Sequence, residues 1–168
     1  MSLIKTSRHR LADLVRPHKV IVPDPILPES KPLVTTLAEA IAECKFHEVS
    51  RDIILEHFSF EGPVADVSEM LTITQTEIGP TNKTSTAIKR EIDRMGCRPA
   101  TIIEQLAYAK TKWDGNATII ALGSSWVSRD GRHNLPCLYS DAEGRKLGLN
   151  WEIPAVHWHE YSFLVVRK

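Results

Sequence analysis

The residues best suited to chemistry lie together near the C-terminus, at positions 157–161. They are His157, Trp158, His159, Glu160 and Tyr161. In an extended segment His157 and His159 point to the same side, because side chains alternate across a strand. Two imidazoles on one face could bind Zn²⁺ if the fold added His133, Cys137 or a carboxylate. The sequence has no second spaced pair of ligands, so we interpret the cluster as a binding loop without metal or cofactor.

This cluster leads to two classes of function. The preferred hypothesis is a binding module for an unknown protein or small ligand, in which residues 128–161 present loops on a rigid sheet. The alternative is a metal-dependent or thiol enzyme that uses His157 and His159, with Cys137 as its candidate thiol. A third hypothesis is an oligomer, in which the basic N-terminal arm of one copy (residues 1–33) docks on the acidic middle of another (residues 34–80, with nine acidic and two basic side chains).

The other chemically interesting side chains favour structural roles. Trp126 and Trp151 lie in strand-like patterns and are predicted core anchors, whereas Trp158 is the candidate ligand contact. Cys137 stands alone in its region, and a free cysteine usually behaves as a small buried hydrophobe. The sequence contains no GxSxG nucleophile elbow around the serines that follow Gly123.

The bulk composition is that of an ordinary globular domain, with 168 residues, 42% hydrophobic and 25% charged. Lysine plus arginine equals aspartate plus glutamate at 21 each, which gives no overall reason to expect nucleic acid or an acidic membrane as a partner. The sequence shows neither a leader-like apolar run nor a membrane-spanning stretch. Three cysteines without a CxxC motif are typical of a reducing compartment, so we predict a cytoplasmic protein.

Prolines divide the chain into an arm and a domain. Five prolines between positions 17 and 32 exclude a helix or a central strand there. Residues 1–33 are therefore predicted to form a Pro-rich basic arm. Residues 34–168 are predicted to form a single α+β domain, which begins with a helical prefix over 34–62.

Local patterns predict the elements of this domain. In the prefix, the capping-box pair Thr36 and Glu39 opens a helix that runs to about Phe46, and a second short helix follows at 50–58. A stretch rich in Val, Ile and Thr predicts one long strand over 67–78. The remaining sequence predicts two helices, at 84–95 and 101–113, and antiparallel strands at 118–122, 135–139, 147–151 and 163–166. Strands and helices do not alternate throughout, which favours an α+β fold with a mainly antiparallel sheet.

Two stretches resemble the formylglycine-generating-enzyme-like proteins. Residues 98–109 (RPATIIEQLAYA) resemble their R-x-P-T-x-x-E-W-E-Y-A helix start with the proline shifted by one place, and residues 162–167 (SFLVVR) resemble their closing strand. Those proteins have a C-type-lectin-like fold, so the resemblance implies a lectin-like unit over 67–168 with two helices packed on the sheet. Related domains serve as ligand-binding tips in retroelement-diversified bacterial and phage proteins. The catalytic members use a cysteine pair near the final strands, where this chain has Cys137 alone.

The C-terminal third also resembles a group of uncharacterised bacterial proteins. These share an "ALGS-x-W … R-x-L-x-L-x-W … F-L-x-V-R-K" tail, which appears here at 121–126, 145–151 and 163–168. This second resemblance implies no known activity.

Overall fold

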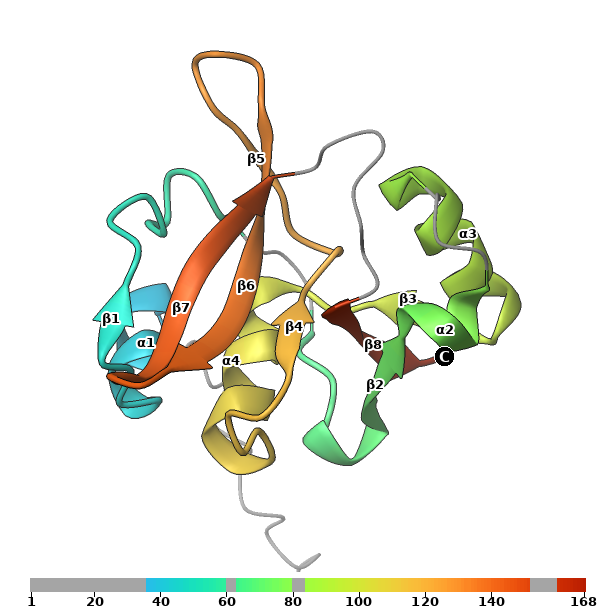
Figure 1. Cartoon of the computed structure of the whole chain (residues 1–168), viewed down its shortest axis with the longest axis horizontal. Coiled ribbons are helices and arrows are strands. Elements are labelled where there is room, and N and C mark those ends of the chain that lie inside the picture. The colour runs from blue at the N-terminus through green and yellow to red at the C-terminus, as the bar shows by residue number, and fades with distance from the viewer. Residues whose placement is uncertain (1–35, 60–62, 80–83, 152–159) are drawn as a thin grey trace, which may run out of the picture. The chain divides into compact units, whose positions relative to one another are not determined.

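Eight strands form one sheet in the part of the chain that the structure describes, which is residues 36–59, 63–79, 84–151 and 160–168 (Figure 1). In this computed structural model the sheet order is β1 (Glu48–Val49), β7 (Gly144–Trp151), β6 (His133–Asp141), β4 (Thr118–Ile120), β8 (Tyr161–Arg167) and β2 (Met70–Thr74). In addition, β3 (Cys97–Pro99) pairs with β8, and β5 (Trp126–Val127) pairs with β6. β1 is parallel to β7 and β4 to β8, and the other pairings are antiparallel. The predicted α+β class with a mainly antiparallel sheet is therefore confirmed.

Threonine caps begin the helices. α1 (Leu37–Glu43) and α4 (Ile102–Thr111) both start at a capping box, in which a threonine oxygen and a glutamate carboxylate each accept a backbone amide. α3 (Ser85–Arg94) starts at Thr84, whose hydroxyl accepts the amide of Ala87. The helices predicted near 84–95 and 101–113 are confirmed. α1 is shorter than predicted, and Lys45 beyond its end has a positive φ of 53°.

Two predicted elements are wrong. The expected strand over 67–78 is a 3-10 turn, η1 (Val67–Glu69), then β2, then one helical turn, α2 (Gln75–Ile78). The strand ends because Thr74 and Glu77 form a capping box, which turns the backbone into a helix. The expected helix over 50–58 is a series of turns, in which the Ile53 amide donates to the Ser50 carbonyl.

The two faces of the sheet pack against different helices. Leu164 and the α4 residue Leu106 belong to one buried apolar cluster, to which α1 also contributes. Phe163 belongs to a second cluster, with Ile88 and Ile92 of α3. Because successive residues of a strand face opposite sides, β8 contributes to both clusters in alternation. The sheet is therefore held rigidly from both faces.

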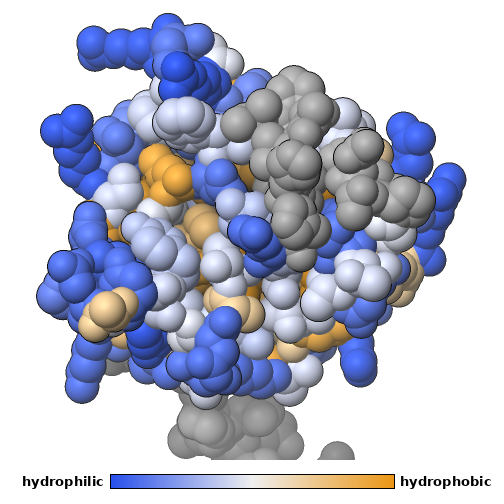
Figure 2. All heavy atoms as spheres, viewed as in Figure 1, coloured by the Kyte–Doolittle hydropathy of each residue, from blue (hydrophilic) through white to orange (hydrophobic). Residues whose placement is uncertain are grey.

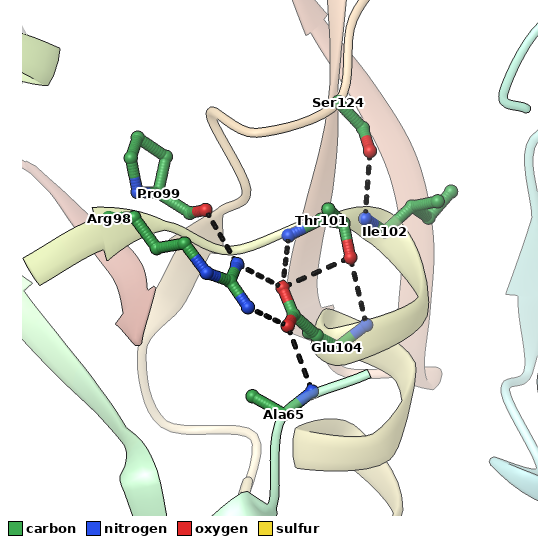
Figure 3. A network of polar contacts seen from close by, with 7 residues as sticks. All are labelled: Ala65, Arg98, Pro99, Thr101, Ile102, Glu104 and Ser124. Carbon is green, nitrogen blue, oxygen red and sulfur yellow. Dashed lines mark hydrogen bonds and ion pairs between the residues drawn. The ribbon is translucent and has the colours of Figure 1, made fainter. Parts of the chain in front are cut away.

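A sharp turn at residues 121–124 fits against the start of α4. A Cβ atom on Gly123 would lie 2.5 Å from the carbonyl oxygen of Ala100, a backbone atom that cannot move aside easily. The Gly123 amide donates to that same oxygen over 2.9 Å. Ser124 Oγ accepts the amide of Ile102, one of the helix amides without an intrahelical partner (Figure 3). These contacts require the Gly-Ser pair of the ALGS stretch.

A buried carboxylate joins the start of α4 to β3 and to a neighbouring loop (Figure 3). Glu104 is 1% exposed and receives both ends of the Arg98 guanidinium, at 2.9 and 2.5 Å. It also accepts the backbone amides of Thr101, at 2.8 Å, and Ala65, at 3.1 Å. Burial by itself raises the pKa of Glu104, but hydrogen bonds from Arg98 and the two amides outweigh it, so the pKa lies below its usual value.

Candidate functional site

A surface groove of about 980 Å³ lies beside strand β7. Its walls are the segment 48–52, strand β7, and the β5–β6 turn at 128–132. Figure 2 shows that hydrophilic side chains project from the surface at the tip of the β5–β6 turn. Aromatic side chains and both signs of charge line the groove, a composition suited to binding a polar ligand with an apolar or planar part.

Two tryptophans lie in register across three strands at the groove. Asn134 of β6 pairs with Trp126 on β5 and with Trp151 on β7. Residues directly opposite in antiparallel strands share a face, so both indoles lie on the same side of the sheet. Asn134 is 5% exposed and its amide donates to the carbonyls of Trp126 and Arg132. The buried asparagine therefore fixes the spacing of the two indoles.

A second planar group packs on each of the two indoles. The Arg132 guanidinium lies 4.4 Å from the ring centroid of Trp151, a cation–π contact. The His57 ring stacks on Trp126 with centroids 3.9 Å apart and an 11° angle between planes. Trp151 is nevertheless 49% exposed. A large aromatic surface is thus held in place while remaining accessible to a ligand.

The β5–β6 turn positions the arginine. Asp130 accepts the Ser128 hydroxyl at 2.5 Å and pairs with Arg132 Nε at 3.0 Å. The Ser128 amide donates to the Arg132 carbonyl, and Gly131 supplies the positive φ of 81° that the turn requires. The hydrogen bond from Ser128 is the main reason that the pKa of Asp130 is lowered. The turn therefore holds Arg132 above Trp151 without help from a ligand.

Some charged side chains at the groove have an ion-pair partner within the protein, and others do not. Glu48 pairs with Lys146, which is almost buried and also contacts Asp141 at 2.8 Å and Glu143 at 2.7 Å. Hydrogen bonds to these carboxylates, first that to Asp141, raise the pKa of Lys146. Glu48 and Asp130 are thus neutralised within the protein, by Lys146 and Arg132.

Two exposed arginines at the groove remain uncompensated. Neither Arg51 nor Arg129 has an ion pair or a side-chain hydrogen bond within the described ranges. They come from opposite walls, Arg51 from the segment after β1 and Arg129 from the β5–β6 turn. The Asp52 carboxylate, which also lines the groove, has no ion pair among the described residues either, so an anionic group would meet two unpaired cations and one carboxylate.

An aromatic ring packs on a glycine at two residues that also line the groove but lie on the face of β6 and β7 opposite to the two indoles. Tyr139 of β6 and Gly148 of β7 are diagonal neighbours, and a Cβ atom on Gly148 would lie 2.7 Å from the Tyr139 ring. A larger residue at position 148 would displace the ring. The paired strands are therefore shaped around this contact.

Of the predicted site residues, only Glu160 and Tyr161 lie in the described part of the chain, and neither is among the groove residues. His157, Trp158 and His159 lie outside the described residues. Glu160 is exposed just before β8, and Tyr161 is the first residue of β8, half-buried against the second apolar cluster.

One tryptophan prediction is wrong, since Trp151 is exposed at the groove and is no core anchor. Strand alternation could not reveal this, because an apolar stripe looks the same on a core face and on a groove wall. The cross-strand partner of Trp151, Asn134, decides its environment.

The described residues contain no activated thiol. Cys137 is 5% exposed, as predicted, and burial raises its pKa to about 12. Cys44 and Cys97 are also buried, and all three cysteines are free. Within these residues, no group of three or more His, Cys, Asp or Glu side chains is placed to hold a metal ion.

Comparison with known proteins gives no relative. No family model matches the chain, and neither the curated proteins nor the solved structures contain a significant match. None of the helices in the described ranges has the length and apolar character needed to cross a membrane.

Proposed function

We propose that the protein is a binding module that recognises a ligand or a protein through this groove. The observation that carries the proposal is the pair of tryptophans in register, one of them exposed beneath an arginine that the protein itself holds in place. An exposed indole is costly to leave in water, and aromatic and arginine side chains are enriched at recognition sites. Part of the predicted recognition region 128–161 lines the groove, which supports the same function.

The rigidity of the groove also favours binding. One wall, strand β7, belongs to a sheet that packs on both faces, Asn134 fixes the indole spacing, and hydrogen bonds within the β5–β6 turn hold a second wall. A site that is already ordered loses little conformational entropy when it binds. The groove therefore suits recognition of a planar or apolar group by stacking, with the arginines selecting for negative charge.

A C-type-lectin-like arrangement of residues 67–168 is part of this proposal. The antiparallel pairing of β2 with β8 supports it, because the first and last strands of the unit lie side by side. The motif residues Arg98, Thr101 and Glu104 meet in one network, which gives the resembling stretch a structural purpose (Figure 3). The three free cysteines support a reducing, cytoplasmic location.

The test is a binding screen with a readout at each indole. The isotope-labelled full chain is titrated with a panel of single sugars, nucleosides, amino acids and short peptides. At least one class should shift the indole N–H signals of Trp151 and Trp126. The Trp113 indole, which is buried and donates to the Ala117 carbonyl, should not move.

A matched pair of variants completes the test. Trp151→Ala should weaken binding of any such probe at least about tenfold. Val127→Ala is the control, because Val127 is 51% exposed on the neighbouring strand but does not line the groove. Signals that shift only outside the groove, or a Trp151 variant that binds as the wild type does, would contradict the proposal.

A further inference from the structure

Strand β7 has an outer edge that is only half covered. β1 pairs with β7 at Lys146 and Leu147 alone, whereas β7 continues to Trp151 (Figure 1). Within the described residues, no strand pairs with the outer edge of β7 beyond Leu147. A strand edge of this kind is a template for pairing with another chain.

The hydrogen bonds between strands show which amides and carbonyls of β7 point outward, away from β6. The carbonyl of Leu147 points outward, because it accepts the amide of Ser50 at 2.8 Å. Backbone groups alternate between the two sides of a strand, so the amide and carbonyl of Leu149 point outward as well. The amide of Trp151 also points outward, since it is bonded to the side chain of Asn150 and not to β6. Leu149 therefore offers one donor and one acceptor at the groove.

The chain itself turns away from this edge. The Ser50 carbonyl, which would be next to meet β7, accepts the Ile53 amide at 3.0 Å instead. The turn that results places Arg51 and Asp52 in the groove wall beside the edge. This turn leaves residues 149–151 of β7 without a pairing strand from the segment after β1.

The surroundings of the edge indicate what could occupy it. The apolar side chains of Leu149 and Trp151 line the groove, and so do the uncompensated Arg51 and Arg129. A neutral small molecule would contact the indoles, but it would not use the outward backbone groups of β7 or the charges of the arginines. An extended peptide with an acidic side chain would use all three.

We infer that the groove takes an extended, acidic peptide segment, which adds to the β7 edge at residues 149–151 beyond the end of β1. The inference rests on the proposed function and names its class of partner. Backbone hydrogen bonds to Leu149 provide affinity that does not depend on sequence. Apolar contacts with Trp151, and charge contacts with Arg51 and Arg129, select the peptide.

The first experiment identifies a peptide and locates it. A displayed library of linear random peptides is selected against the full chain, and the most enriched peptide is synthesised. The selected peptides should be enriched in acidic residues and in residues that favour strands. The bound peptide should slow hydrogen exchange of the Leu149 amide. The Asn150 amide, which by alternation faces β6, should be unaffected. A failure to enrich acidic peptides, or unchanged exchange at Leu149, would overturn the inference.

Variants separate the backbone contact from the charge contact. Leu149→Pro removes the outward amide, and proline is tolerated where a strand edge faces solvent. It should weaken peptide binding at least about tenfold relative to Leu149→Val, which also changes the side chain but keeps the amide. If the proline variant does not fold, the exchange measurement decides in its place.

The double charge reversal of Arg51 and Arg129 to glutamate should also weaken binding about tenfold or more and abolish its salt dependence. Arg90→Glu, an exposed reversal on α3, is the control. Binding that is unchanged in the double variant would overturn the choice of an acidic partner.

The outcomes distinguish this inference from the proposed function. If small probes shift the Trp151 indole but no peptide protects the Leu149 amide, the groove binds ligands and only the strand addition is wrong. If neither probe affects the groove, both proposals fail. If Leu149 becomes protected only as the protein concentration rises, the occupant is a second copy, and the inference of a separate peptide is wrong.

Discussion

Replacing Glu104 by glutamine tests how strongly one buried carboxylate ties α4 to the sheet. The carboxylate is 1% exposed and accepts the Arg98 guanidinium and two backbone amides. Glutamine keeps the shape but directs an NH₂ group at one set of donors and leaves the Arg98 charge without its counterion. Removing one partner of a fully buried ion pair costs about 3–5 kcal/mol. The Arg98 side chain is 38% exposed, so water screens part of the loss, and Glu104→Gln should lower the free energy of unfolding by about 1.5–3 kcal/mol.

The pH dependence provides a sharper form of this prediction. The folded-state pKa of Glu104 lies below the ordinary value of 4.5. The stabilisation is therefore complete above 4.5 and is lost as the pH falls through the lower folded-state pKa. The stability gap between wild type and Glu104→Gln should be constant at neutral pH and shrink in acid.

Urea denaturation followed by circular dichroism measures both quantities. Glu43→Gln is the matched control, because Glu43 forms an exposed ion pair with Lys110, and such pairs contribute about 0–1 kcal/mol. The reasoning is refuted if Glu104→Gln changes stability by less than about 0.5 kcal/mol at neutral pH, the range of ordinary surface substitutions. It is also refuted if the gap persists unchanged in strong acid.

Two further outcomes follow from the turn at residues 121–124 and from the thiols. Gly123→Ala should lower the free energy of unfolding by about 2 kcal/mol or more, because its Cβ would overlap the Ala100 carbonyl, while the exposed neighbour Ser125→Ala should cost less than about 0.5 kcal/mol by thermal denaturation. Equal melting temperatures for the two variants would contradict the close approach. Cys137 should resist a thiol reagent in the folded protein at mildly alkaline pH, since burial holds its pKa at about 12, and react after denaturation. Rapid labelling of Cys137 in the native state, located by mass spectrometry, would show that the thiol is accessible.

Contacts between near neighbours in the chain could be predicted from sequence. The capping boxes at Thr36 and Thr101 involve residues three positions apart, so the pattern contains both partners. The missed helical turn after β2 has the same signal, because Thr74 and Glu77 are also three apart. The strand pattern of the surrounding residues concealed it. Alternation over 67–78 favours a strand, whereas the capping pair ends the strand at Thr74.

Contacts between distant residues required the tertiary structure. Lys146 gathers Glu48 from far upstream together with Asp141 and Glu143, and neither spacing nor composition indicates this. Residues 128–161 were predicted as a recognition region, but most of the groove residues outside that range come from β1 and the segment after it. Strand pairing brings these segments together.

By itself the sequence determined the class of the fold and most of the helices and strands, because capping and strand alternation are local properties. Only the tertiary structure decided which aromatic side chains are accessible. Trp126 and Trp151 have the same local pattern as core residues, and their environment depends on the register with Asn134 and on the point where β1 ends. The strand register, and the extent to which an edge strand is paired, depend on contacts between segments far apart in the chain. A local sequence pattern therefore cannot predict them.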